Sequence, residues 1–233
     1  MKTKIIALLI VASCLLSSCS YVPKVVSTDD TGNVNSFINP DTGIEYVACS
    51  PAIHPIVVSD VYCAYSSETQ FSKIKNEDPL RLICDDDKIL SYVYRDKNLP
   101  EITMKTYNPV MAYLFLEGAT SQYLYTLHPE KKYLSESAQA AGETPDGSEY
   151  IYTIRDTINN TAPVENDPNK DIDENVTVFI RLCSADYPGL FYEVIFWSNK
   201  AGDYFLMDRG TKLSYDCPES VAEIIIYALY LYA

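Results

Sequence analysis

The strongest constraint on the fold lies in the last third of the sequence, where the spacing of apolar residues is typical of β-strands. Alternate positions of one stretch are apolar: Val176, Val178, Ile180 and Leu182. This period of two places them on one face of a strand, with Arg181 on the other face. Leu190 to Trp197 is apolar on both faces apart from Glu193, which is typical of a central strand covered on both sides. Tyr204 to Met207 and Leu213 to Tyr215 follow after short turns, so we expect an antiparallel meander.

The chain ends in a segment with helical spacing. Asp216-Cys217-Pro218-Glu219 has the acid-x-x-Glu pattern of a capping box, with proline in the first turn. The apolar stripe that follows is Val221, Ile224, Ile225, Ala228, Leu229 and Tyr232. We expect this helix to pack on the sheet. Because Ile226 and Tyr230 broaden its apolar surface, docking of a partner is the alternative.

Upstream of the meander, short runs rich in β-branched and aromatic residues are separated by turn signals. The first expected hairpin joins Leu80 to Cys84 with Ile89 to Arg95. The second joins Val110 to Leu116 with Gln122 to Leu127. Tyr150 to Ile158 also contains many β-branched and aromatic residues and predicts a further strand.

Two polar segments interrupt these strands. Pro129 to Ala141 predicts a short helix, because proline suits the first turn and Gly142 can cap the end. Asn159 to Glu174 is polar, contains two prolines and predicts a long exposed loop. We therefore expect one β-rich α+β domain over residues 41–233, with antiparallel strands and the C-terminal helix packed on the sheet.

The N-terminus has the composition of an export signal. Lys2 and Lys4 precede an apolar run from Ile5 to Leu16, and small residues follow before Cys19. The run is too short for a membrane span of ~20 residues. We expect a signal peptide over residues 1–18 that is removed; an uncleaved anchor helix is the alternative.

The stretch Leu16-Ser17-Ser18-Cys19 resembles the lipobox of bacterial lipoprotein precursors. The resemblance implies cleavage before Cys19, a diacylglycerol thioether on its sulfur, fatty acyl chains such as palmitate, and an exported protein moored at the cell envelope. Cys14 is a poorer candidate, because apolar residues follow it at once. Residues 19–40 are rich in Ser, Thr, Asp and Asn and predict a flexible tether between the lipid and the domain.

The charge balance restricts the partners. The sequence has 32 acidic and 18 basic side chains and a net charge of −14. Such a surface repels nucleic acid and anionic lipid headgroups. We therefore expect no nucleic-acid partner, and attachment to the membrane through the lipid on Cys19. The 20 tyrosines suit half-buried strand positions and binding surfaces equally, because each has an apolar ring and a polar tip.

Loss of Cys14 and acylation of Cys19 would leave an odd number of cysteines: Cys49, Cys63, Cys84, Cys183 and Cys217. No two of them form Cys-x-x-Cys, so the sequence contains neither a zinc ribbon nor a thioredoxin-like motif. An oxidising compartment favours disulfides. Buried thiols that pack as small apolar side chains are the alternative, and the pairing stays open.

No motif of catalysis or cofactor binding occurs. His54 and His128 each precede a proline, and two histidines are too few for a zinc or copper site; a Cys–His pair assembled by the fold stays open. The acidic run 85–87 predicts a turn. The run 167–173 fails as a calcium loop, because Ile172 stands where glycine is needed. We therefore expect no catalytic residue, no metal and no cofactor.

These observations favour a non-enzymatic binding or interaction lipoprotein of the cell envelope, with a protein or glycan partner. One alternative is a hydrolase of wall or envelope glycans, which would need a cleft with two carboxyl groups ~5–10 Å apart. The other is a structural subunit of an envelope complex, which an exposed apolar patch on the C-terminal helix would favour.

Overall fold

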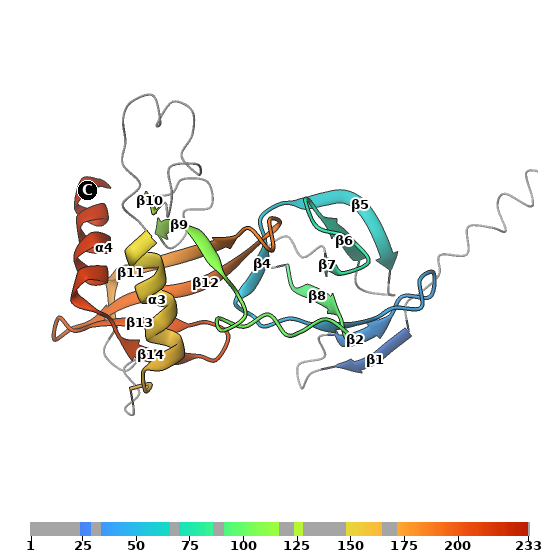
Figure 1. The fold of residues 1–233 in the computed structure, drawn as a ribbon, viewed down its shortest axis with the longest axis horizontal. Helices are drawn as coiled ribbons and strands as arrows, with labels where there is room; N and C mark the ends of the chain where they lie inside the picture. Colours follow the sequence, from blue (N-terminus) through green and yellow to red (C-terminus); the bar gives the residue numbers. More distant parts are fainter. Residues whose placement is uncertain are drawn as a thin grey trace, which may run out of the picture.

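The computed structural model describes residues 24–28, 34–65, 70–85, 91–116, 124–127, 148–164 and 172–232. Within these residues it contains two antiparallel sheets, here called sheet A and sheet B, and two helices (Figure 1). The β-rich α+β fold predicted from the sequence is confirmed, including the C-terminal helix.

Sheet A comes from the N-terminal part of the chain and has the strand order β1–β2–β3–β8–β7–β6–β5. Its strands are β1 (Lys24–Thr28), β2 (Val34–Ile38), β3 (Glu45–Ala48), β5 (Val58–Tyr65), β6 (Gln70–Ile74), β7 (Leu82–Asp85) and β8 (Val93–Asp96). Strands β7 and β8 are antiparallel neighbours, which confirms the first predicted hairpin.

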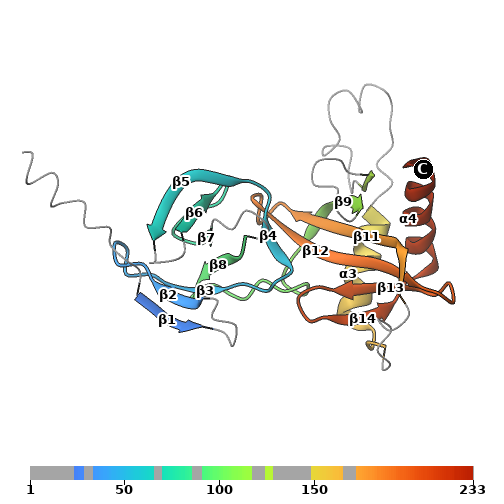
Figure 2. The same ribbon diagram turned by 180° about the vertical axis from the view of Figure 1, so that it is seen from behind.

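Sheet A curls on itself around a small group of buried rings. Phe37 on β2 and Phe71 on β6 belong to strands four places apart in the sheet, yet their ring centroids are 4.1 Å apart. A flat sheet would separate these strands by roughly 19 Å, so the strands must wrap around the rings (Figures 1 and 2). The residues enclosed by the curl, the aromatic cluster, are Phe37, Tyr46, Phe71, Ile83 and Tyr94.

The prediction of a tether over residues 19–40 is wrong for two stretches. Strands β1 and β2 fall inside it and pair with each other, and β2 also pairs with β3. Phe37 is completely buried in the aromatic cluster. The polar composition of the segment concealed its few apolar residues, and a single ring such as Phe37 is enough to hold a strand when a curled sheet encloses it.

Sheet B has the order β10–β9–β11–β12–β13–β14, with β4 (Ile53–Pro55) pairing to the start of β12. Its other strands are β9 (Pro109–Leu116), β10 (Tyr125–Leu127), β11 (Ile172–Ser184), β12 (Leu190–Asn199), β13 (Tyr204–Asp208) and β14 (Leu213–Asp216). The predicted meander and the second predicted hairpin are both confirmed. The predicted inward residues Val178, Ile180 and Leu182 are fully buried.

Helices α3 (Ser148–Asn160) and α4 (Glu219–Tyr232) add their apolar faces to the core of sheet B. Helix α4 begins directly after Pro218, as the capping pattern predicts. The predicted strand Tyr150 to Ile158 is wrong, because this segment is α3. Ile151, Ile154 and Ile158 recur with helical spacing and are buried, so this period outweighs the strand preference of the individual residues. The predicted helix Pro129 to Ala141 lies outside the described residues.

Adjacent residues of β12 point to opposite sides of sheet B. Tyr192 and Val194 enter the core beneath the helices. Phe191 and Glu193 lie on the other side, here called the outer face, over which neither α3 nor α4 packs (Figure 2). The sequence predicted that this strand is covered on both sides, and this holds only in part: on the outer face Glu193 and Trp197 are buried, whereas Phe191 and Ile195 are partly exposed.

The two sheets meet at the turn between β11 and β12. The Gly189 N–H donates to Glu77 Oε1 at 2.8 Å, and its carbonyl accepts from the Ile56 N–H at 2.8 Å. A Cβ atom on residue 189 would lie 2.4 Å from the Lys75 carbonyl oxygen, so only glycine permits this approach. Ile74, Leu82 and Val93 of sheet A join the main core of sheet B through the same region.

Candidate functional site

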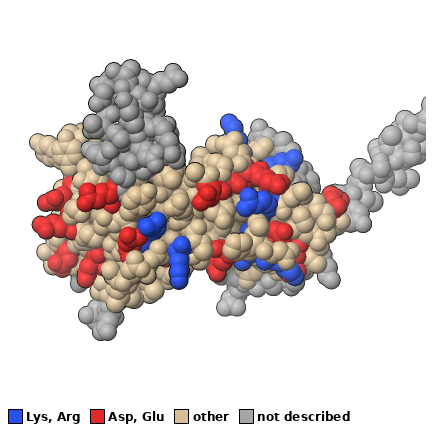
Figure 3. All heavy atoms as spheres, in the orientation of Figure 1, with Lys and Arg blue, Asp and Glu red and all other residues tan. Residues whose placement is uncertain are grey.

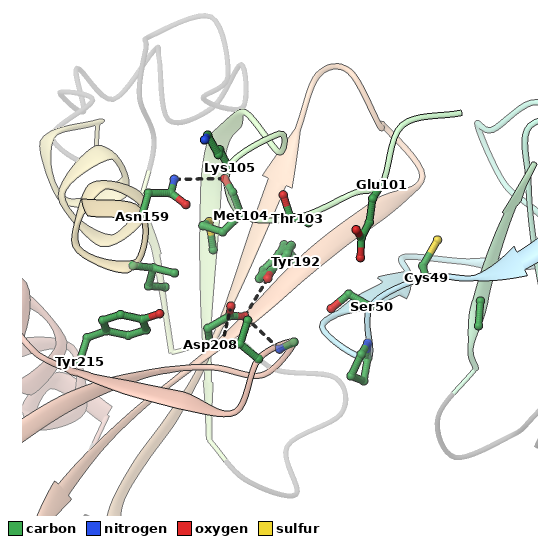
Figure 4. A pocket seen from close by; sticks show the side chains of 15 residues that line it. Cys49, Ser50, Glu101, Thr103, Met104, Lys105, Asn159, Tyr192, Asp208 and Tyr215 are labelled. Atoms are coloured by element: carbon green, nitrogen blue, oxygen red, sulfur yellow. Dashed lines mark hydrogen bonds between the residues drawn. The ribbon is translucent and has the colours of Figure 1, made fainter. Parts of the chain in front are cut away.

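A cavity of about 390 Å³ lies where sheet A, sheet B and the end of α3 come together (Figure 4). Sheet A contributes Ala48 and the turn that follows it, and the segment from Glu101 to Lys105 forms another wall. The cavity is lined by Ala48, Cys49, Ser50, Pro51, Glu101, Thr103, Met104, Lys105, Ile158, Asn159, Tyr192, Asp208, Gly210, Thr211 and Tyr215. Its volume falls within the range of ~300–1,000 Å³ typical of small-molecule sites.

Asp208 organises one wall of the cavity. It ends β13 and is 3% exposed. Its Oδ1 atom accepts from the Tyr192 hydroxyl at 2.7 Å and from the Gly210 N–H at 2.9 Å, and its Oδ2 atom accepts from the Thr211 hydroxyl at 3.0 Å. Aspartate followed by glycine two residues later is a turn-forming pattern, so one side chain both closes the β13–β14 turn and orients Tyr192.

Tyr192 is held as a hydrogen-bond donor. Burial, and next the charge of Asp208, raise the pKa of its hydroxyl far above the ordinary value. The phenol therefore stays protonated at every physiological pH and can donate to Asp208. In Figure 4, Tyr215 and Glu101 lie on opposite sides of this pair.

A short irregular segment forms the wall opposite β13. The Thr106 hydroxyl donates to the Glu101 carbonyl at 2.8 Å and accepts from the Thr103 N–H at 2.9 Å. The Asn159 amide of α3 donates to the Met104 carbonyl at 3.4 Å. These bonds fix the backbone on which the Glu101 and Thr103 side chains are carried.

The structure brings no histidine to Cys49, the one cysteine that lines the cavity. Burial raises the pKa of the Cys49 thiol to about 12, so the reactive thiolate is scarce at neutral pH. His54 sits on the outer face of sheet B, where its ring is 5.3 Å from that of Phe191. The sequence alone could not exclude a nucleophilic cysteine activated by a histidine. Among the described residues that line this cavity, no histidine is available to activate Cys49.

The remaining cysteines and the second histidine are placed as follows. Cys49, Cys84, Cys183 and Cys217 carry free thiols. The side chain of Cys63, together with Cys19 and His128, lies outside the described residues. The prediction of lipidation at Cys19 therefore stays a prediction.

Acidic side chains gather at the end of the molecule that carries α4 (Figure 3). Four of them line a surface hollow of about 530 Å³ beside the start of that helix: Asp203, Asp216, Glu219 and Glu223. Within the described part of the chain, no group of three or more His, Cys, Asp or Glu side chains is arranged to hold a metal ion. Asp85, from the acidic run 85–87, accepts from the Tyr92 N–H at 2.7 Å across the β7–β8 hairpin.

Two carboxylates, Glu101 and Asp208, line the cavity, and neither was selected from the sequence. Among the carboxyl groups of the described residues, that of Glu77 has its pKa raised by burial, and Glu77 bonds Gly189 and lines no part of the cavity. A signal for Asp208 did exist: an acidic residue at a strand end followed by Arg209-Gly210 indicates a side chain that caps a turn. No local pattern pointed to Glu101.

Comparison with known proteins gave no match: no family model, no curated protein and no solved structure is similar to this chain.

Proposed function

We propose that this protein is a non-enzymatic, lipid-anchored binding protein of the cell envelope, and that the cavity between the sheets receives one small neutral ligand rich in hydroxyl groups, such as a sugar unit. The observation that carries the proposal is the lining of the cavity. Hydroxyl, amide and carboxylate groups surround about 390 Å³ beside two tyrosine rings.

The lining favours a neutral ligand over an anion. Glu101 and Asp208 are acceptors, and the only cationic side chain of the lining, Lys105, points away from Asp208 (Figure 4). The Glu101 carboxylate can accept hydrogen bonds from ligand hydroxyls, and Thr103 and Asn159 offer both donors and acceptors. Tyr192 and Tyr215, which also line the cavity, are 2% and 5% exposed, so they offer a ligand little more than their ring edges and hydroxyl groups.

The same geometry favours binding over hydrolysis. Both oxygens of Asp208 already accept hydrogen bonds from protein donors, and the Cys49 thiol is protonated. A glycosidase needs a second carboxyl group that is free to give up or take a proton. Glu101 is the one candidate for that role, so the hydrolase alternative rests on this residue.

Ligand binding is tested by calorimetric titration of the detergent-solubilised full-length protein with glucose, galactose, N-acetylglucosamine and a β-1,4-linked disaccharide of each. We expect at least one of them to bind, and Asn159→Leu to weaken binding by roughly fivefold to tenfold, as for loss of one hydrogen bond. Asn160→Leu is the matched control, because Asn160 is the next residue of α3 and does not line the cavity. The absence of any binding, or equal losses in both variants, would contradict the proposal.

Cleavage of a disaccharide during the titration would favour the hydrolase instead. In that case Glu101→Gln should abolish cleavage and leave binding nearly intact.

The membrane anchor has its own test. Cys19→Ala should move the protein from the membrane fraction to the soluble fraction, and mass spectrometry of the native protein should find an acylated N-terminal cysteine. No described helix is long and apolar enough to cross a bilayer. Unchanged membrane retention of Cys19→Ala would contradict a lipid anchor.

One observation favours a second candidate, a subunit of an envelope complex. Tyr227, Tyr230 and Leu231 of α4 are 52%, 80% and 57% exposed. Crosslinking in intact cell envelopes should capture one partner in defined proportion if α4 docks it, and Tyr230→Ser should reduce that product.

A further inference from the structure

The outer face of sheet B carries a row of charged side chains across an otherwise aromatic and apolar surface. Arg181 on β11 is paired in register with Glu193 on β12, and Arg209 follows the end of β13. Arg181 Nε donates to Glu193 Oε2 at 3.3 Å, and Arg209 Nη1 donates to Glu193 Oε1. The Glu193 side chain is 3% exposed, whereas those of Arg181 and Arg209 are 29% and 27% exposed.

This row has one positive charge in excess. One guanidinium is enough to neutralise the buried carboxylate of Glu193, and among the described residues no other carboxylate pairs with Arg181 or Arg209. The chain as a whole has a net charge of −14, so a local cationic surplus on a sheet face runs against the general field of the molecule. An anion that reaches this face would therefore be attracted by the positive charge of the row, although the molecule as a whole repels it.

Arg181 is held in a fixed orientation, and some of its N–H donors have no partner within the described ranges. Its guanidinium lies 4.3 Å from the ring centroid of Phe115 and 4.8 Å from that of Phe191. Its Nε is occupied by Glu193, and its two terminal nitrogens donate to no residue in the part of the chain that the structure describes. A planar guanidinium with both terminal nitrogens available matches the two oxygens of a carboxylate or phosphate.

The surroundings add a second unsatisfied polar group. His54 is 8% exposed and tilts against Phe191, and its Nε2 atom has no hydrogen-bond partner among the described residues. Burial, followed by the charges of Arg209 and Arg181, lowers the pKa of His54 to about 4, so the ring is neutral at pH 7. A buried ring nitrogen without a partner is uncommon in folded proteins, and in the tautomer that protonates Nε2 it would donate to an anion held beside it.

The geometry points to an anion-binding site on the outer face of sheet B. Its ligand is a carboxylate or phosphate group attached to an aromatic ring. Arg181 and Arg209 bind the anionic group, and Phe115 and Phe191 contact the ring. The site lies on the opposite side of β12 from the cavity, which none of these residues lines. It is therefore independent of the neutral-ligand site proposed above.

The test is a titration of the detergent-solubilised full-length protein with benzoate, phenyl phosphate, acetate and inorganic phosphate in low-salt buffer. Calorimetry gives the affinities, and the arginine Nε–H resonances report which guanidinium responds. We expect the two aryl anions to bind roughly tenfold more tightly than the two bare ions, because the rings add apolar contact. The ratio of benzoate to phenyl phosphate affinity distinguishes a carboxylate site from a phosphate site.

Arg181→Gln should weaken aryl-anion binding by roughly tenfold or more, and Arg181→Lys by less, because lysine keeps the charge and loses the planar fork. Arg155→Gln is the matched control. Arg155 is also 29% exposed, also pairs with a carboxylate, Asp156, and also lies over a ring, that of Tyr152. It should leave the affinity unchanged.

Three results would overturn the inference: no shift of the Arg181 resonance in wild-type protein, equal affinity for aryl and bare anions, or an equal loss in Arg155→Gln. The wild-type titration decides the question even if Arg181→Gln does not fold.

Discussion

Sheet A and sheet B bury their apolar residues in different ways. Sheet B is covered by two helices, and its core is built from aliphatic side chains at alternate strand positions, such as Ile180, Leu182 and Val194. No described helix packs into the curl of sheet A, where four of the five cluster residues are aromatic rings. A sheet without a helical cover can exclude water only by wrapping around itself, and large rings fill that space with few residues.

The two sheets also differ in their relation to the proposed ligand sites. The aromatic cluster of sheet A is closed to solvent, since its five residues are at most 2% exposed and Phe37 stacks on both Tyr46 and Phe71. Both candidate ligand sites involve sheet B: the cavity lies where it meets sheet A, and the charged row lies on its outer face. Sheet A therefore acts as a support that completes one wall of the cavity.

The largest expected effect is that of Phe37→Ala, which removes the ring at the centre of the cluster. We expect a loss of about 4 kcal/mol in unfolding free energy, measured by urea denaturation. Hydrogen exchange should report faster exchange in β2, β6 and β8 than in β11 and β12 if the two sheets differ in local stability. Equal acceleration everywhere would mean that the two sheets unfold as one unit.

The next effect concerns His54 on β4, the strand that precedes β5 of sheet A in the chain and pairs with β12 of sheet B. Its pKa is lowered from 6.5 to about 4. Below pH ~6.5 the unfolded chain binds a proton that the folded chain does not accept until pH ~4, so stability present above pH ~6.5 is lost as the pH falls through this window. The loss should reach about 3 kcal/mol.

Urea denaturation at pH 7, 5.5 and 4.5 measures the part of this loss that falls above pH 4.5, about 2 kcal/mol. His54→Gln should flatten the dependence on pH by that amount, whereas the ordinary carboxylates contribute equally to both proteins. If the unfolding free energy of the wild type and of His54→Gln depended on pH equally, the pKa of His54 would not be lowered in the folded protein.

Gly189→Ala should strain the contact between the two sheets. The new Cβ atom would meet the Lys75 carbonyl at 2.4 Å and Glu77 Cγ at 2.7 Å. We expect a loss of about 2 kcal/mol, measured by thermal and urea denaturation. Gly210→Ala is the comparison, because its closest obstacle is the Ser50 hydroxyl at 2.4 Å, a side chain that can rotate. A smaller loss at Gly189 than at Gly210 would contradict a rigid contact.

The smallest expected effect is that of Lys97→Gln in sheet A. Lys97 pairs with Glu45 at the surface, with 51% and 25% of the two side chains exposed. Such pairs contribute ~0–1 kcal/mol, so the melting temperature of the variant should barely differ from that of the wild type, and this difference should shrink further as salt screens the pair. A loss comparable with that of Phe37→Ala would mean that surface charges, rather than the enclosed rings, hold sheet A together.

Where the sequence carried a strong period, prediction and structure agree. The alternation from Val176 to Leu182, the apolar run of β12 and the capping pattern before Glu219 each depend on neighbours along the chain. The prediction of α3 as a strand was wrong because β-branched residues were given more weight than the three-and-four spacing of Ile151, Ile154 and Ile158. The tether prediction was wrong because composition was averaged over a segment in which only a few residues, Phe37 above all, are buried.

The sequence by itself determined the meander, the C-terminal helix and the acidic surface, since local spacing and composition are sufficient for each. Only the tertiary structure decided which distant residues meet: Phe37 with Phe71, Glu101 with Asp208 around one cavity, and Arg181 with Arg209 on one carboxylate. The physical reason is that the curl of sheet A and the register of sheet B bring together residues far apart in the chain, and no local pattern encodes such contacts.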